Sequence, residues 1–154
     1  MMKIRNGFVS NSSSSSFIVF NNNTYAKLHD EINTIDISSA LKVPETLGGE
    51  TEFGWEKVKH EDIGSKINFA YIQALVMGQE YIDMLERVLI EEFKIPSIEF
   101  NITEDMDGEG QWGYIDHQSS ASEGENTEIF DNEAMLKNFL FTVGSYIQGG
   151  NDNE

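Results

Sequence analysis

The longest regular pattern of apolar positions runs through residues 62–94 and has the spacing of a helix. Apolar side chains recur three or four residues apart, among them Ile67, Tyr71 and Leu85. This period predicts an amphipathic helix, which ends before Pro96 because proline cannot continue one. Gly78 either divides the segment into two helices or lies inside one long helix at a cost of about 1 kcal/mol. The apolar stripe is broad enough to predict packing against a sheet.

Two later segments alternate apolar and polar positions, which is typical of strands with one solvent-exposed face. Residues 97–102 and residues 111–116 show this alternation, the second with Trp112 and Tyr114 on the same side. The connecting residues 104–110 are rich in glycine and acidic side chains. The pattern therefore predicts a β-hairpin.

The N-terminal region contains five consecutive serines at residues 12–16, followed by the apolar run at residues 17–20. β-Branched and aromatic side chains crowd residues 15–20, which predicts a strand. Its consecutive apolar residues predict a central strand with both faces buried. Because Phe8 and Val9 lie on the other side of the serines, we expect an ordered segment with serine hydroxyls bonded to nearby backbone groups.

Three shorter elements complete the expected secondary structure. Residues 25–32 predict a short helix that Thr24 could cap, and residues 131–141 predict another that Asp131 caps. Residues 145–148 predict a last strand.

Together these elements predict an α+β fold, a small and mostly antiparallel sheet packed against helices. We expect one domain over residues 1–150 and a tail at 151–154. Phe53 and Trp55 fit an edge strand or an aromatic-anchored loop, and are expected in the core rather than on a nucleic-acid stacking platform. The other expected core residues are Phe17, Val19, Phe69, Leu75, Leu85, Leu89, Ile98, Phe100, Phe139 and Phe141.

Composition agrees with a folded cytosolic protein. The 154 residues are 39% hydrophobic and include ten Phe, enough to form a core. We expect no membrane span and no signal peptide, because no long apolar segment is present. Without cysteine, the chain has no disulfide framework and no thiolate zinc site.

The charge is strongly negative and unevenly distributed. The formal net charge is −17. Residues 1–94 carry nine basic and fourteen acidic side chains, whereas residues 95–154 carry thirteen acidic side chains and the single basic residue Lys137. Such a field repels nucleic-acid phosphate, so direct binding to nucleic acid is disfavoured. It either keeps the protein soluble or attracts the basic surface of a partner protein.

The acidic segment that follows residue 103 is the best candidate for a binding or metal site. Asp105, Asp107, Glu109 and Asp116 have the spacing of positions 1, 3, 5 and 12 in a calcium-binding loop, with Gly110 at position 6. Calcium-binding loops of this kind lie between helices, whereas this segment lies between predicted strands. Two interpretations are therefore open: the carboxylates bind Ca²⁺ or Mg²⁺, or they belong to a turn and face the solvent. The carboxylates expected to meet a basic partner are Glu104, Asp105, Asp107, Glu109, Glu123, Glu125 and Glu128.

A weaker catalytic candidate follows the second strand. Asp116, His117 and Ser119 supply an acid, an imidazole and a hydroxyl, which a hydrolase-like enzyme could use. Adjacent strand residues point to opposite faces, so Asp116 and His117 would not pair directly within a strand. An exposed loop histidine is the alternative. His29 and His60 are expected at the surface.

Three groups of segments carry a resemblance to known proteins. They are Gly7-Phe8-Val9-Ser10-Asn11 with the serines and Phe17, Glu52-Phe53-Gly54-Trp55-Glu56 with Ser65-Lys66-Ile67-Asn68-Phe69, and Tyr114-Ile115-Asp116-His117-Gln118-Ser119 with Tyr146-Ile147-Gln148-Gly149-Gly150-Asn151-Asp152-Asn153. Together these segments resemble a group of small proteins of bacteriophages and Gram-positive bacteria. The resemblance implies a phage-type accessory protein and assigns no catalytic residues.

Charge and resemblance together favour a non-enzymatic protein that acts in the host cytoplasm. It would bind a basic surface of a host protein, mimicking nucleic acid there. Two alternatives stay open: a small metal-binding protein or enzyme built from residues 105–119, and a minor virion or assembly protein.

Overall fold

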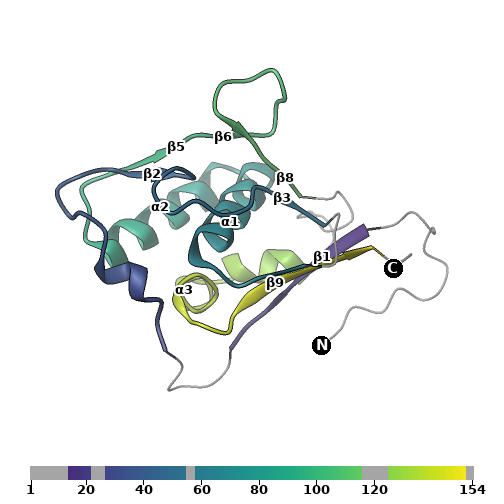
Figure 1. Ribbon diagram of the computed structural model, residues 1–154, viewed down its shortest axis with the longest axis horizontal. Helices are drawn as coiled ribbons and strands as arrows, with labels where there is room; N and C mark the ends of the chain where they lie inside the picture. Colours follow the sequence, from purple (N-terminus) through teal and green to yellow (C-terminus); the bar gives the residue numbers. More distant parts are fainter. Residues whose placement is uncertain (1–13, 22–26, 55–57, 116–124, 152–154) are drawn as a thin grey trace.

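The computed structural model describes residues 14–21, 27–54, 58–115 and 125–151. Its elements in chain order are β1 (Ser14–Val19), η1 (Asp30–Asn33), β2 (Leu41–Val43), β3 (Glu52–Phe53), β4 (Lys59–His60), α1 (Ile63–Met77), α2 (Gln79–Phe93), β5 (Ile98–Phe100), β6 (Ile102–Thr103), β7 (Gln111–Trp112), β8 (Tyr114–Ile115), η4 (Glu125–Phe130), α3 (Glu133–Phe141) and β9 (Tyr146–Asn151). The helices α1 and α2 lie between short parallel strands on one side and β1, β9 and α3 on the other (Figure 1). The α+β prediction is confirmed.

The predicted long helical segment consists of two helices that meet at Gly78. This glycine has φ 131° and ψ 169°, a backbone conformation that side chains with a Cβ rarely adopt. The first prediction for Gly78, a break between two helices, is therefore confirmed. The second helix ends at Phe93, where Lys94 takes a left-handed conformation ahead of Pro96.

The first of these helices, α1, is the centre of the molecule. All eight residues from 63 to 70 are buried, including Ser65, Lys66 and Asn68. It contacts the parallel strands, α2 and α3, so no broad side of its first half faces solvent. By contrast, α2 buries only one stripe, formed by Leu85, Val88, Leu89 and Phe93.

An antiparallel sheet of three strands, in the order β1-β9-β4, lies on the side of α1 away from the parallel strands (Figure 1). Six residue pairs join β1 to β9, from Ser14 opposite Asn151 to Val19 opposite Tyr146. The predicted strand at 15–20 is thus confirmed, but its predicted central position is wrong, because β9 occupies the middle of the sheet. The last strand also extends to Asn151, the first residue of the expected tail.

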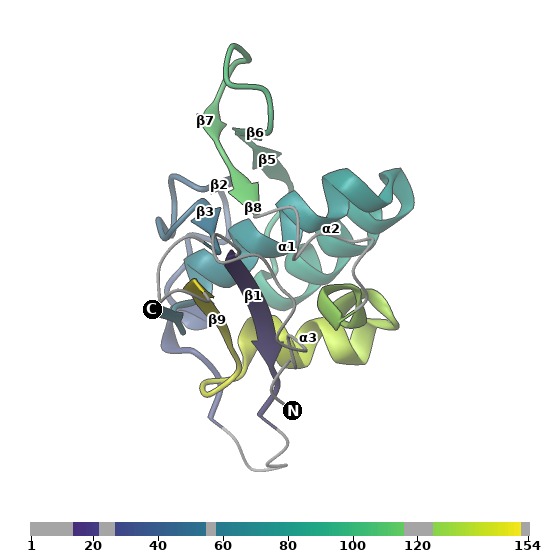
Figure 2. The ribbon, with the colours of Figure 1, turned by 90° about the vertical axis from the view of Figure 1, so that its right-hand side faces the viewer.

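The other side of α1 is covered by parallel pairs of short strands. β2 pairs with β5, β6 with β7, and β3 with β8, all parallel. The predicted hairpin between residues 97–102 and 111–116 is therefore wrong. The connecting residues 104–110 form a closed loop that brings the chain back in its original direction (Figure 2).

The core contains half of the side chains expected there. Phe69, Leu85, Leu89, Phe139 and Phe141 are buried, as is Phe53. Val19, Leu75, Ile98 and Phe100 are only half-buried, because they lie at the margins of their elements. The side chain of Phe17 and the whole of Trp55 lie outside the described residues.

The ends of two predicted helices differ from expectation. α3 is capped by Asn132, whose Oδ1 accepts a hydrogen bond from the Met135 N–H at 2.9 Å, and not by Asp131. The N–H of Asp131 donates to the Glu128 carbonyl and closes the preceding turn, so the helix begins one residue later. Of the helix expected at 25–32, residues 25 and 26 and the expected cap Thr24 lie outside the described residues, and the helical structure in the remainder is η1, a 3-10 turn at Asp30–Asn33.

Candidate functional site: an aromatic and acidic face on the parallel strands

The strands β7 and β8 place two aromatic rings on the outer face of the molecule. Gly113 and Ile115 are buried against α1, and the alternation of a strand therefore turns Trp112 and Tyr114 the other way. A Cβ at Gly113 would lie 2.5 Å from Ile102 Cγ2 and 2.8 Å from Ile72 Cδ1, so this position needs glycine. Both aromatic side chains are half-buried, and their rings stack with centroids 5.7 Å apart and planes 11° apart.

Hydrogen bonds from both neighbouring strands hold the backbone under these rings. On one side, Gln111 N–H donates to the Asn101 carbonyl at 2.7 Å and Gly113 N–H to the Thr103 carbonyl at 2.8 Å. On the other side, Thr51 Oγ1 donates to the Trp112 carbonyl at 3.0 Å. The tryptophan is therefore presented by a fixed backbone.

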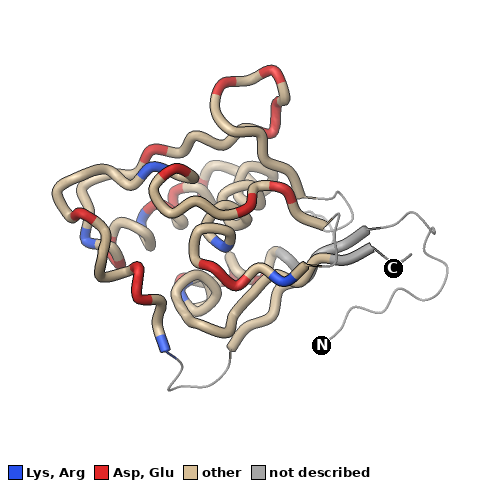
Figure 3. The backbone as a smooth tube through the Cα atoms, viewed as in Figure 1, with Lys and Arg blue, Asp and Glu red and all other residues tan. Residues whose placement is uncertain are grey.

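The loop of residues 104–110 rises from the end of β6, next to Trp112. All seven of its residues are exposed, and Met106 has 74% of its surface accessible. Figure 3 shows this loop projecting from the rest of the molecule with acidic positions along it, and these positions supply four carboxylates. They belong to Glu104, Asp105, Asp107 and Glu109.

Local hydrogen bonds give this loop a defined shape. Asp105 N–H donates to Thr103 Oγ1 at 3.0 Å, and Asp105 Oδ1 accepts from the Asp107 N–H at 2.9 Å. The Gly108 N–H donates to the Asp105 carbonyl at 2.9 Å. Asp105 thus organises the turn through its side chain and its backbone.

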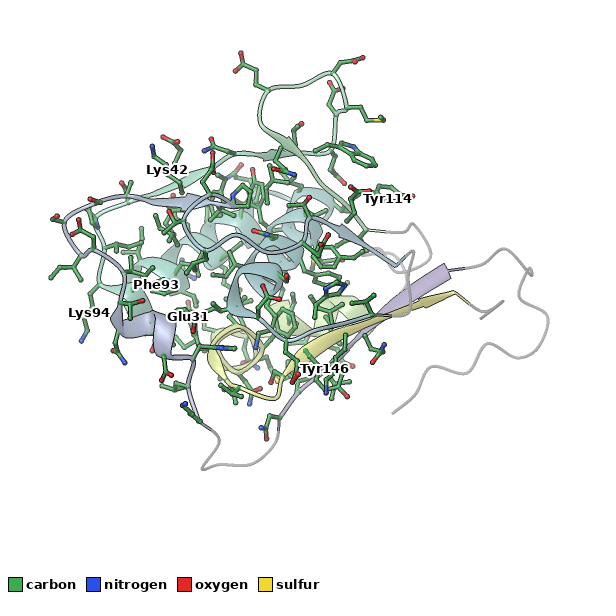
Figure 4. The ribbon with its side chains drawn as sticks, in the orientation of Figure 1. Glu31, Lys42, Phe93, Lys94, Tyr114 and Tyr146 are labelled. Atoms are coloured by element: carbon green, nitrogen blue, oxygen red, sulfur yellow. The ribbon has the colours of Figure 1, made fainter. Side chains whose placement is uncertain are left out.

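Among the described residues, the charges around this face are almost all negative. None of the four loop carboxylates forms an ion pair with any described residue. Partial burial raises the pKa of Glu104, and burial together with the Glu104 charge raises the pKa of Tyr71. The one basic side chain on the adjacent strands, Lys42, lies opposite Glu99 and at the other end of the layer from Tyr114 (Figure 4).

The described residues place only part of the predicted metal set. Asp105, Asp107 and Glu109 share the exposed loop, whereas Asp116 lies outside the described residues. Within the described parts of the chain, no three acidic or histidine side chains converge as metal ligands. The Ca²⁺ or Mg²⁺ site therefore stays a prediction.

The predicted catalytic residues Asp116, His117 and Ser119 also lie outside the described residues, as does Glu123. The carboxylates predicted to bind a basic partner divide into two groups. Four share the loop, whereas Glu128 is exposed on η4, in the separate part of the structure beside α3 (Figure 2). Of Glu125, only the backbone is described, and it lies in η4 as well.

A second polar centre lies inside the molecule at Lys66. Its side chain has 0% of its surface exposed, and its Nζ donates to the carbonyl oxygens of Thr142 at 3.0 Å and Ser145 at 2.9 Å. Burial lowers the pKa of Lys66 to about 8, although the charges of Asp62 and Glu61 raise it. These two hydrogen bonds join α1 to the turn before β9. Because the amine has no exposed surface, it is not placed to react with a substrate.

The two described histidines are not simple surface residues, contrary to expectation. His29 is half-buried, and its buried Nε2 has no hydrogen-bond partner among the described residues. Burial and the Lys66 charge lower the pKa of His29. His60 packs edge-to-face against Phe53, with ring centroids 5.2 Å apart.

Sequence reasoning did not identify Trp112 and Lys66 as members of these sites. The signal for Trp112 was the alternation with Gly113 and Ile115, which places it beside Tyr114 on one face. The signal for Lys66 was its position inside a segment with apolar or small residues on every side of the helix.

Comparison of the chain with models of known protein families, with curated proteins and with solved structures finds no match. Among the described residues, no helix has both the length and the apolar character needed to cross a membrane.

Proposed function

We propose that this chain is a non-enzymatic, phage-type accessory protein that binds a basic surface of a host protein in the host cytoplasm. Its carboxylates would occupy positions that nucleic-acid phosphates take on that surface. One observation carries the proposal: the exposed loop of residues 104–110 holds four carboxylates that form no ion pair with any described residue.

Among the described residues, no basic side chain forms an ion pair with a loop carboxylate. Two basic side chains on the helices are engaged locally, since Arg87 pairs with Glu133 and Lys137 with Glu91 at 2.7 Å. A net charge of −17 on 154 residues therefore produces a negative field that speeds encounter with a basic surface. The same field opposes direct contact with nucleic acid.

The defined shape of the loop supports binding over a purely solubilising role. A solubilising surface needs charge but no fixed geometry. Here Asp105 uses its side chain and its carbonyl to order the turn, which limits the entropy lost when a partner binds.

The test is affinity purification from host lysate at about 0.05 M and about 0.5 M salt, with the retained proteins identified and assayed for nucleic-acid binding. We expect a basic, nucleic-acid-binding protein at low salt, its loss at high salt, and release of its nucleic acid when this protein is added. Retention of nothing basic at low salt contradicts the proposal. A captured protein that keeps its nucleic acid contradicts the mimicry.

A further inference from the structure

We propose that Trp112 and the loop of residues 104–110 form a docking site for an arginine-rich segment of a basic protein. The inference rests on the proposed function and deepens it, because it names the surface and the side-chain chemistry that this surface selects.

The first step is the tryptophan itself. Trp112 lies on the outer face of β7 with its backbone fixed from both sides and its ring stacked on Tyr114. Indole is the strongest aromatic partner for a cation, and a planar guanidinium stacks on it better than an ammonium does. A rigid indole is also a typical anchor in protein interfaces because it loses little conformational entropy on binding.

The second step is the charge next to the ring. Thr103 pairs with Trp112 across β6 and β7, and the acidic loop begins at the next residue, Glu104. An arginine stacked on Trp112 would thus lie beside a group of carboxylates, which adds attraction to the contact with the ring. Since the loop carboxylates have no ion-pair partner among the described residues, a basic segment would not have to break existing pairs.

The third step is the exposed methionine at the loop. Met106, with 74% of its surface accessible, is the most exposed large apolar side chain in the described part of the chain. Methionine adapts to irregular surfaces and can cover the aliphatic stems of arginine side chains. Aromatic ring, carboxylates and an apolar side chain together fit arginine better than they fit a phosphate, a lipid surface or an apolar helix.

The experiment uses the full chain and two synthetic peptides of equal length and charge, one of arginine and one of lysine. Binding is followed by the fluorescence of Trp112 in a Trp55→Phe background and, independently, by calorimetry. We expect the arginine peptide to bind about fivefold more tightly than the lysine peptide, as a cation–π contact of about 1 kcal/mol predicts.

The first variant removes the ring. Trp112→Leu, assayed by calorimetry, is expected to bind the arginine peptide about fivefold more weakly and to lose the preference for arginine over lysine. Trp112→Phe keeps an aromatic face and is expected to retain part of the preference. A change in folding alone would weaken the binding of both peptides equally and leave the preference for arginine unchanged. An unchanged preference for the arginine peptide in Trp112→Leu would therefore overturn the proposal.

The second variant removes the loop charge without changing its turn geometry, because an amide oxygen can replace the carboxylate oxygen at position 105. It combines Glu104→Gln, Asp105→Asn, Asp107→Asn and Glu109→Gln. A matched control removes the same charge from α2 through Glu80→Gln, Asp83→Asn, Glu86→Gln and Glu92→Gln. We expect the loop variant to weaken binding of both peptides and reduce its salt dependence well beyond the α2 control.

The outcomes separate the two proposals. If neither peptide binds the unaltered protein at low salt, the proposed function itself fails. If both peptides bind but the loop variant and the α2 control weaken them equally, the acidic protein still binds basic partners and only this docking site is wrong.

Discussion

Lys66 on α1 donates a hydrogen bond at 2.9 Å to the carbonyl oxygen of Ser145, a residue 79 positions later in the chain. A second bond, to the Thr142 carbonyl, makes this buried amine the link between the central helix and the turn that starts β9. No carboxylate forms an ion pair with Lys66 among the described residues, so two carbonyl dipoles hold it. This arrangement has a consequence for stability that depends on pH.

The free energy of unfolding should rise between about pH 8 and the ordinary pKa of lysine. Burial lowers the pKa of Lys66 from 10.5 to about 8 in the folded protein. Between those values the unfolded chain binds more protons than the folded protein, so the folded state gains stability as pH increases. Chemical denaturation at several pH values measures the effect.

The variant Lys66→Met removes the titrating group and should flatten this rise, whereas Lys27→Met should not. Lys27 is exposed, and among the described residues it pairs only with Asp30, at 3.4 Å. Equal pH profiles for the unaltered protein and Lys66→Met would show that Lys66 keeps its ordinary pKa in the folded state.

Gly78→Ala should lower the free energy of unfolding by about 1–3 kcal/mol. The cost is in the backbone, because φ 131° and ψ 169° suit only glycine, and the space around a new Cβ is empty. Gly48→Ala is the matched control, since its surroundings are also empty but its φ of 72° lies in the left-handed region. That region costs other residues about 1–2 kcal/mol. An effect of Gly78→Ala no larger than that of Gly48→Ala would contradict the argument.

Asn132→Ala should lower the free energy of unfolding by about 1 kcal/mol, because it removes the side-chain cap of α3. Asp131→Ala should have a smaller effect, since the capping oxygen belongs to Asn132 and the Asp131 backbone N–H remains. Thermal unfolding of the two variants compares the residues directly. A larger loss of unfolding free energy for Asp131→Ala than for Asn132→Ala would show that Asp131 caps the helix, as the sequence predicted.

The structure shows which parts of the fold could be predicted from the sequence. Local patterns were sufficient where the cause is local: the apolar period of residues 62–94 and the strand before Phe20 appear in the structure. For Gly78 the sequence left two alternatives open, and the structure has the break between two helices. The shift of the cap from Asp131 to Asn132 is a difference of one residue between two good capping side chains.

Strand direction was not a local property. Alternation at residues 97–102 and 111–116 predicts strands but not their orientation, and the short connection favoured a hairpin. Pairing with β2 and β3, from a different part of the chain, accompanies the parallel arrangement and the closed loop at 104–110. The acidic loop of the candidate site was predicted from the sequence. The position of Trp112 beside the loop depends on the parallel pairing of β6 and β7, and it became clear only from the structure.

Deleting residues 1–16 should lower the melting temperature more than deleting residues 1–13. The longer deletion removes Ser14, Ser15 and Ser16, which pair with Asn151, Gly150 and Gly149, three of the six residue pairs between β1 and β9. Loss of these backbone hydrogen bonds should cost about 1–3 kcal/mol, and the shorter deletion keeps all six pairs. Replacing residues 14–16 by threonine is the control, because it keeps the backbone bonds and suits a strand. Equal melting temperatures for the two deletions would show that the serine end of β1 adds no stability, and that its apolar residues alone hold the strand against β9.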